Sequence, residues 1–196
     1  MKIPRMSSLG RFFAAAAGLV LLAGSSAFAQ RLDKPEHYTA TILAEGDYVA
    51  YARFLRVDVT IWQYSTPQDQ QSLVQAFERG GQQGLVNALS RMSAKGHVDI
   101  PGTLGYDLSY VKVFQTPNGR RIRAVTNRSI RFGEAWTDSR SMSYDLGMFE
   151  LDFGNNKGKG GGEVIFAGQF IVSKGQLTVE SYGAGPFKVI QIDTWK

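Results

Sequence analysis

Residues 107–126 read DLSYVKVFQTPNGRRIRAVT, and this stretch decides the fold. Its Asn118-Gly119 pair lies between two β-prone runs, 107–115 and 120–126, and an Asn-Gly pair in that setting is the strongest short-range signal for a β-hairpin. Strands joined by so short a turn pair antiparallel, because parallel strands need a long crossover. The sequence therefore predicts an antiparallel sheet that extends outward from this hairpin.

Strand patterns continue on both sides of the hairpin. Val57, Val59 and Ile61 alternate with polar residues, which is typical of a strand with one buried face. Together with the hairpin, strands are expected at residues 38–44, 56–64, 97–100, 107–115, 120–126, 144–153, 163–172, 176–181 and 187–193. Turn residues such as Lys174-Gly175 separate the later strands, so we expect antiparallel pairing throughout.

Between residues 66 and 93 the hydrophobic period changes to that of a helix. Thr66 suits an N-cap, and Asp69 stands three residues later, where a capping box places an acid. Gly80-Gly81 is expected to end a first short helix, and a second short helix follows it. Each has one narrow apolar face, so the pair should dock on a sheet because such helices are not stable alone.

These patterns together predict an α+β fold. We expect a strongly curved antiparallel sheet or a partly closed barrel of about seven to nine strands, with a pair of short helices near residues 66–93 packed on one side. The domain should cover residues 38–196. Residues 30–37 are polar and include Pro35, so a flexible lead-in is expected there.

The first 29 residues have the pattern of an export signal. Three cations precede an uncharged apolar run at residues 12–24, and Ala27-Phe28-Ala29 follows as a small-x-small cleavage site. The run would reach about 20 Å, too short for a hydrocarbon core of about 30 Å. We therefore expect a Sec-type signal peptide over residues 1–29 and cleavage after Ala29. A periplasmic or extracellular location and no membrane insertion after cleavage would follow.

The composition of the chain excludes several classes of active site and of binding partner. The chain has no cysteine, which excludes a thiol nucleophile, a zinc–thiolate site and an iron–sulfur cluster. Three of its 22 cations lie in the predicted leader, and the remaining 19 stand against 17 acids. So small a surplus does not indicate nucleic acid as a partner. We expect no cofactor and no metal, and a partner that is a small molecule or a component of the cell envelope.

The segment 131–141 is the candidate ligand-binding loop. Loops on a rigid sheet often carry binding residues, and Trp with Arg is a combination favoured in recognition. The candidates are Arg131, Glu134, Trp136, Asp138 and Arg140. Trp136 would stack on a ligand, while Arg131 or Arg140 would pair with an anionic group. In the alternative interpretation, Trp136 plugs the open end of the sheet and the charges around it are solvated.

Two other motifs favour structural explanations. The glycine-rich stretch 154–162 lacks the Lys-Ser/Thr pair and the following helix that a phosphate loop requires, so a hairpin tip is expected. His97 and Asp99 would share a strand face about 6–7 Å apart. One His and one Asp complete neither a catalytic triad nor a metal site, so we expect an ordinary surface pair.

Two carboxylates on one strand face, Glu150 and Asp152, resemble the acid pairs of glycoside hydrolases. Arg121 and Arg123, however, share one face of the hairpin's second strand. Pairing of these two strands would form a water-facing charge ladder, which is the interpretation we favour.

Part of the chain, from Tyr64 to about Phe153, resembles a group of small exported bacterial proteins of unknown function. The pieces that carry the resemblance are Tyr64-Ser65-Thr66-Pro67, Ala76-Phe77, Gly80-Gly81, Gly105-Tyr106-Asp107-Leu108, Gly119-Arg120-Arg121-Ile122, Glu134-Ala135 and Arg140-Ser141. The resemblance implies one exported domain. It implies no activity, catalytic residue or ligand.

Three functions remain open at this point. The leading hypothesis is a non-enzymatic ligand-binding or accessory module of the cell envelope, since no complete catalytic set is found. The alternative is a hydrolase that uses carboxylates such as Glu134 and Asp138. The third is a structural or interaction protein that pairs through a sheet edge, for which the strand at 187–193 would have to be unpaired.

Overall fold

The computed structural model describes residues 31–44, 53–130, 144–154 and 160–194. In chain order, this part of the protein comprises β1 (Arg31–Ala44), β2 (Arg53–Gln63), α1 (Pro67–Arg91), β3 (Gly96–Asp99), β4 (Tyr106–Thr116), β5 (Gly119–Thr126), β6 (Leu146–Gly154), β7 (Gly161–Ser173), β8 (Gln176–Ala184) and β9 (Phe187–Thr194). Each of the nine expected strands overlaps one of these strands.

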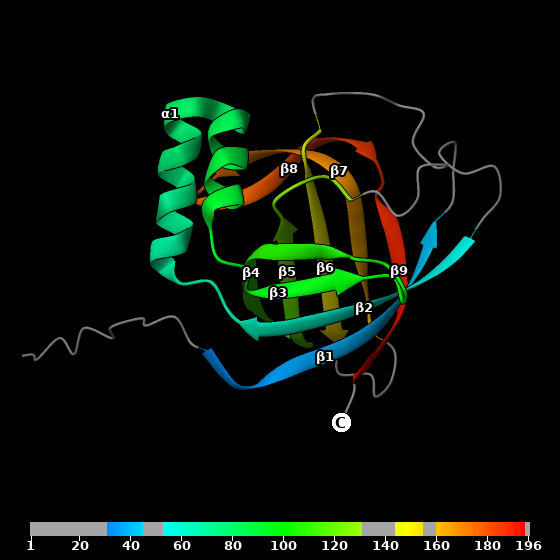
Figure 1. Cartoon of the computed structure of the whole chain (residues 1–196). Coiled ribbons are helices and arrows are strands. Elements are labelled where there is room, and N and C mark those ends of the chain that lie inside the picture. The colour runs from blue at the N-terminus through cyan, green and yellow to red at the C-terminus, as the bar shows by residue number, and fades with distance from the viewer. Residues whose placement is uncertain (1–30, 45–52, 131–143, 155–159, 195–196) are drawn as a thin grey trace, which may run out of the picture.

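All strand pairs are antiparallel, and the order in the sheet is β6-β5-β4-β3-β2-β1-β9-β7-β8 (Figure 1). An additional pairing between β6 and β7 closes all strands except β8 into a ring. The fold is therefore dominated by an antiparallel sheet, as expected. Its strands form a ring-like arrangement that is not a barrel, so the sequence-based alternative of a partly closed barrel is not the arrangement observed.

The Asn118-Gly119 hairpin is confirmed. β4 and β5 pair along their length, and Thr116 faces Gly119 at the turn. Gly119 has φ 141°, and a Cβ built there would overlap the carbonyl oxygen of Phe153 on β6. Glycine is therefore needed at this position both for the backbone conformation and for the close approach of β6.

The ring is filled by a buried apolar core. Val57, Val59 and Ile61 are all buried, which confirms the alternation expected for their strand. Every ring strand contributes to this core, and β8 does not. The core side chains are Tyr38, Ala40, Ile42, Val57, Val59, Ile61, Val98, Leu108, Val111, Ile122, Ala124, Ile130, Phe149, Leu151, Val164, Phe166, Phe187, Val189 and Ile192. Apolar burial of this kind is the main favourable contribution to folding.

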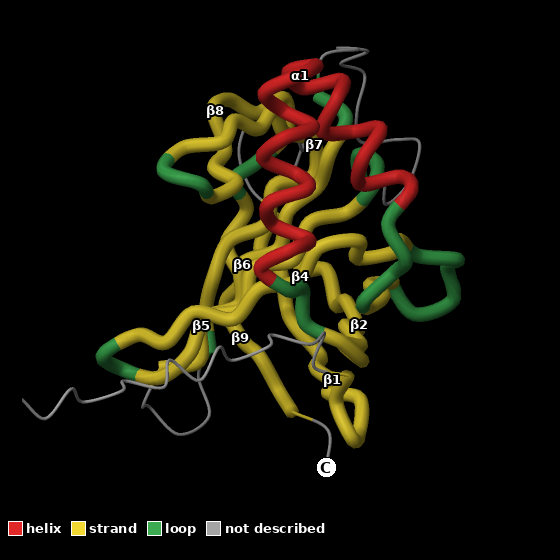
Figure 2. The backbone as a smooth tube through the Cα atoms, turned by 90° about the vertical axis from the view of Figure 1, so that its left-hand side faces the viewer, coloured by secondary structure: helices red, strands yellow, loops and turns green. Residues whose placement is uncertain are grey.

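Helix α1 packs on the outer face of the sheet (Figures 1 and 2). Its Leu73, Leu85 and Leu89 are buried in a second apolar core that β4, β5, β6, β7 and β8 complete. The expected capping box is confirmed, because Thr66 Oγ1 accepts from the Asp69 N–H at 3.0 Å while the Thr66 N–H donates to Asp69 Oδ2 at 2.8 Å.

The expected pair of separate short helices is not supported. Residues 67–91 form one helical element that is interrupted at Gly81, where φ is 55° and ψ is −144°. Gly80-Gly81 therefore marks a break between two helical segments, as expected, although both segments belong to the one element α1. Glycine adopts this positive φ without steric cost, which is why the kink falls on it.

The first strand begins earlier than the sequence indicated. The sequence predicts a flexible lead-in over residues 30–37, whereas β1 already includes Arg31 and reaches Ala44. A register shift between Arg31 and Glu36 interrupts its pairing with β2. The predicted leader, residues 1–29, lies outside the described residues. In the part of the chain that the structure describes, no helix has the length and apolar character needed to cross a membrane.

Candidate functional site

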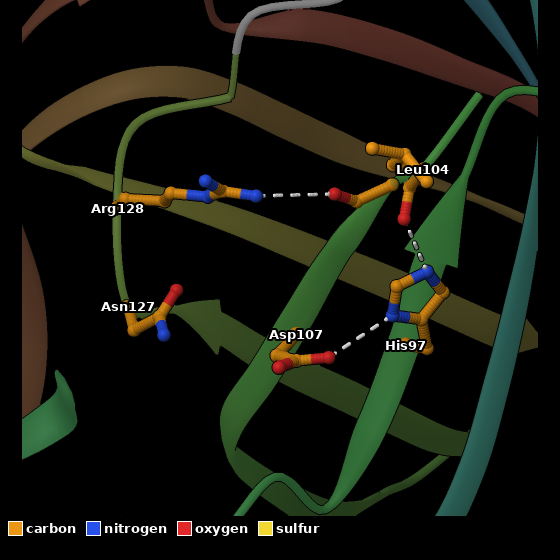
Figure 3. A pocket seen from close by; sticks show the side chains of 6 residues that line it. His97, Leu104, Asp107, Asn127 and Arg128 are labelled. Carbon is orange, nitrogen blue, oxygen red and sulfur yellow. Dashed lines mark hydrogen bonds and ion pairs between the residues drawn. The ribbon is translucent and has the colours of Figure 1, made fainter. Parts of the chain in front are cut away.

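The candidate ligand-binding residues of the sequence analysis, Arg131, Glu134, Trp136, Asp138 and Arg140, lie outside the described residues. Among the residues that the structure does describe, a pocket of about 370 Å³ opens where β3, β4 and β5 meet their connecting segments. Its lining consists of His97, Leu104, Gly105, Asp107, Asn127 and Arg128 (Figure 3). Of these six residues, only His97 is weighed as a candidate for chemistry on the basis of the sequence.

Three neighbouring strands position these side chains. His97 on β3 is the register partner of Asp107 on β4. Leu104 belongs to the segment that joins these two strands, and Asn127 directly follows the last residue of β5. The β4–β5 hairpin therefore brings residues about 20 positions apart in sequence to the same end of the sheet. Figure 3 shows Asn127 and Arg128 on one side of the pocket and His97 on the other.

His97 is held between two oxygen acceptors. Its Nδ1 lies 3.1 Å from Asp107 Oδ1, and its Nε2 lies 3.1 Å from the carbonyl oxygen of Leu104. A neutral imidazole has one N–H and donates to one of these acceptors, while a protonated ring donates to both. His97 and Asp99 lie on the same face of β3, as expected. The hydrogen-bonded partner of His97 is Asp107, which lies directly across the β3–β4 ladder.

Gly105 allows the connecting segment to approach His97. Its φ is 64°, and a Cβ built there would overlap the Val98 carbonyl oxygen, His97 Nε2 and Asp99 Cβ. A larger residue at this position would displace either the imidazole or the backbone that contacts it. The position of Leu104 at the pocket therefore depends on glycine at the next residue.

Arg128 is fixed by two contacts. Its Nη2 donates to the Gly105 carbonyl oxygen at 3.4 Å, and its guanidinium carbon lies 4.9 Å from the centroid of the Tyr106 ring. No carboxylate of the described part of the chain forms an ion pair with it. The pocket therefore contains an oriented guanidinium whose charge is not matched by any described acid.

The six described lining residues include no Ser, Thr, Cys or Lys, and the one acid among them, Asp107, is hydrogen-bonded to His97. Leu104 is 95% exposed and adds an apolar surface at the pocket. The described lining is therefore mainly polar with one apolar side chain, and placed polar groups of this kind fix the orientation of a bound small molecule.

A second polar cluster lies at the other end of the β4–β5 ladder, next to the hairpin turn. Glu36 Oε2 accepts hydrogen bonds from the hydroxyls of Tyr38 and Tyr64, the second at 2.6 Å. Arg120 Nη1 donates to Glu36 Oε1 at 3.1 Å, and its Nη2 donates to the Tyr38 oxygen at 2.5 Å. The Arg120 guanidinium also lies 5.1 Å from the ring centroid of Phe153.

Burial and hydrogen bonding compete in this Glu36–Arg120 cluster. Burial alone would raise the pKa of Glu36, but the hydrogen bonds from Tyr38, Tyr64 and Arg120 together hold it below its ordinary value. Burial, with the hydrogen bond to Glu36, raises the pKa of both tyrosines well above the usual range. The sequence analysis missed the cluster because Glu36 fell in the assigned lead-in. The available signal was the i, i+2 spacing of Glu36 and Tyr38, which places them on one strand face.

The charge ladder between β5 and β6 is confirmed. Arg121 Nη2 lies 2.6 Å from Asp152 Oδ2, and Arg123 Nη2 lies 2.7 Å from Glu150 Oε2. Both carboxylates are therefore bound to arginine side chains from the neighbouring strand. This arrangement does not support Glu150 and Asp152 as a pair of hydrolytic acids.

Neither a group of metal-binding side chains among the described residues nor a related protein indicates what the pocket does. Within the described ranges, no three His, Asp or Glu side chains are grouped so that they could hold a metal ion. Comparison of the chain with protein-family models, with curated proteins and with solved structures finds no match. The function is therefore argued from the geometry of the site.

Proposed function

We propose that the protein is an exported, non-enzymatic ligand-binding module of the bacterial cell envelope, and that a small molecule binds in the pocket between His97 and Arg128. The observation that carries this proposal is the oriented Arg128 guanidinium beside a pocket of about 370 Å³. Groups that are held in place before binding lose little conformational freedom when a ligand arrives. The pocket meets that condition at both His97 and Arg128.

Export is part of the proposal and rests on the sequence pattern of residues 1–29. Expression of the full chain in an exporting bacterial host tests it. Mass spectrometry of the periplasmic and medium fractions should find a protein that begins at Gln30. A protein that stays in the cytoplasm with residues 1–29 attached would contradict the proposed export.

The two competing functions have less support. The carboxylates proposed for hydrolysis, Glu134 and Asp138, lie outside the described residues. A function through a sheet edge would not use the strand at 187–193, because β9 pairs with β1 on one side and with β7 on the other. Of the two strands at the ends of the order of described strands, β6 also pairs with β7, so β8 is the described strand at which an edge partner would bind.

Ligand screening by two-dimensional ¹H–¹⁵N NMR tests the proposed binding site. We expect at least one compound from a panel of small polar metabolites to shift the amide signals of His97, Leu104 and Asn127. Gly105→Ala should abolish these shifts, because its Cβ would overlap the groups that form the pocket. Gly80→Ala is the matched control, since a Cβ at Gly80 meets nothing within 4 Å. Shifts that persist in Gly105→Ala would contradict this site.

A further inference from the structure

We propose that the ligand is a small organic acid whose carboxylate binds Arg128 and Asn127 and whose short apolar chain lies against Leu104. This inference rests on the proposed function, because it names the chemical class of the ligand of the same pocket. Four properties of the described residues support it: the unmatched charge of Arg128, the orientation of its guanidinium, the adjacent amide, and the exposed leucine beside them.

Arg128 differs from the arginines on β5 in having no ion-pair partner among the described residues. Arg120 pairs with Glu36, Arg121 with Asp152 and Arg123 with Glu150. Arg128, two residues beyond the end of β5, has no such partner in the described ranges. The acid that lines the same pocket, Asp107, is hydrogen-bonded to His97 instead. An anionic ligand would supply the counter-charge that Arg128 does not have among the described residues.

The orientation of the guanidinium suits a carboxylate. Its central carbon lies 4.9 Å from the centroid of the Tyr106 ring, and Nη2 donates to the Gly105 carbonyl oxygen. An arginine held in this way presents its remaining N–H groups as a rigid fork, which matches the two oxygens of a carboxylate. Lysine, a point charge on a flexible stem, would not provide this geometry.

Asn127 adds a neutral donor next to the guanidinium. Its side chain lines the pocket, and no hydrogen bond from its amide to another described residue is found. The amide NH₂ group has two N–H donors, and a carboxylate has about four lone-pair positions. One oxygen can therefore accept from Asn127 while the other accepts from Arg128.

Leu104 and the pocket volume define the rest of the ligand. Leu104 is 95% exposed, so a short apolar chain laid against it would remove apolar surface from water. The volume of about 370 Å³ is near the lower end for small-molecule sites. The ligand should therefore combine one carboxylate with a chain of a few carbon atoms.

Titration with hexanoate and with its neutral isostere hexanamide tests the inference. We expect hexanoate to shift the NMR signals of Leu104, Asn127 and Arg128, and hexanamide to bind at least about tenfold more weakly. Arg128→Gln should weaken hexanoate binding at least about tenfold and leave hexanamide binding unchanged. Arg79→Gln is the matched control, because Arg79 is an exposed arginine on α1 away from the pocket.

A second pair of probes tests the apolar contact. Hexanoate should bind more tightly than acetate, and Leu104→Ser should reduce this difference without changing acetate binding. Arg128→Lys should give an affinity between the wild type and Arg128→Gln, because it keeps the charge but loses the fork. The thermal midpoints of all variants, measured in parallel, confirm that each is folded.

The inference and the proposed function fail in different ways. If hexanamide binds as tightly as hexanoate, or if Arg128→Gln binds hexanoate as the wild type does, the carboxylate assignment is overturned. If only neutral compounds shift the pocket signals, the assignment is also overturned but the proposed binding function stands. If neither these acids nor any compound of the metabolite panel shifts them, both are overturned.

Discussion

Each end of the β4–β5 ladder has an arginine beside an aromatic ring, but the two arginines differ in their ion pairing. At the hairpin end, Arg120 lies on the ring of Phe153 and pairs with Glu36. At the other end, Arg128 lies on the ring of Tyr106 and has no carboxylate partner among the described residues. An arginine stacked on an aromatic ring is common to both. The presence or absence of its counter-ion is what separates a structural cluster from a candidate binding site.

The largest expected effect is on the structural end. Glu36→Gln should lower the free energy of unfolding by about 3 kcal/mol, because Arg120 loses its counter-ion and the tyrosine hydroxyls lose a charged acceptor. Urea denaturation measures the change. Glu78→Gln, at an exposed position on α1, is the control and should change stability by less than about 0.5 kcal/mol. Equal effects of the two substitutions would remove the distinction between the two ends.

The pH dependence of stability sharpens the same comparison. The pKa of Glu36 is lower in the folded protein than in the unfolded chain, so its stabilising contribution is complete above the unfolded value of about 4.5. That contribution is lost as the pH falls through the folded value. The difference in unfolding free energy between wild type and Glu36→Gln should therefore shrink as the pH is lowered from 6 to 3. A difference that stays constant over this range would show that Glu36 does not titrate as described.

A smaller effect is expected in the charge ladder. Arg121 contacts both Asp152 and Glu150, but it lies partly in solvent. Arg121→Ala should lower the free energy of unfolding by less than about 1 kcal/mol, and the loss should decrease at high salt. Chemical denaturation at two ionic strengths measures it. A loss as large as that of Glu36→Gln would show that the charge ladder contributes as much to stability as the Glu36–Arg120 cluster.

The smallest effect on stability is expected at the candidate binding end. Arg128 is exposed and forms no ion pair with a described residue, so Arg128→Gln should change the free energy of unfolding by less than about 0.5 kcal/mol. Differential scanning calorimetry without added ligand measures this change. A loss of several kcal/mol would indicate that Arg128 is a structural residue like Arg120, and the contrast between the two ends would disappear.

Features that depend on neighbouring residues in the chain were predictable from the sequence. The Asn118-Gly119 turn, the alternation of Val57, Val59 and Ile61, and the Thr66–Asp69 capping box are all local, and each is found in the structure. The direction of strand pairing follows from short turns and was predicted too.

Features that depend on contacts between distant segments were not predictable. The pairing of His97 with Asp107 requires the register of β3 against β4, and the Glu36–Arg120 contact joins residues 84 positions apart. Neither contact can be predicted from the spacing of residues within one segment of the sequence. Gly81 shows a related limit within α1, since the sequence predicts helix on both sides of Gly80-Gly81 but not that the two segments form one element. The five residues chosen at 131–141 lie outside the described residues and remain a prediction.

The position of β9 in the ring has a consequence for the order of folding. β9 follows all the other strands along the chain, and it joins β1, the first strand, to β7. Until residues 187–194 have left the ribosome, the edges of β1 and β7 that β9 covers have no strand to bind. These two edges are therefore where an unfinished chain is open to pairing with another chain.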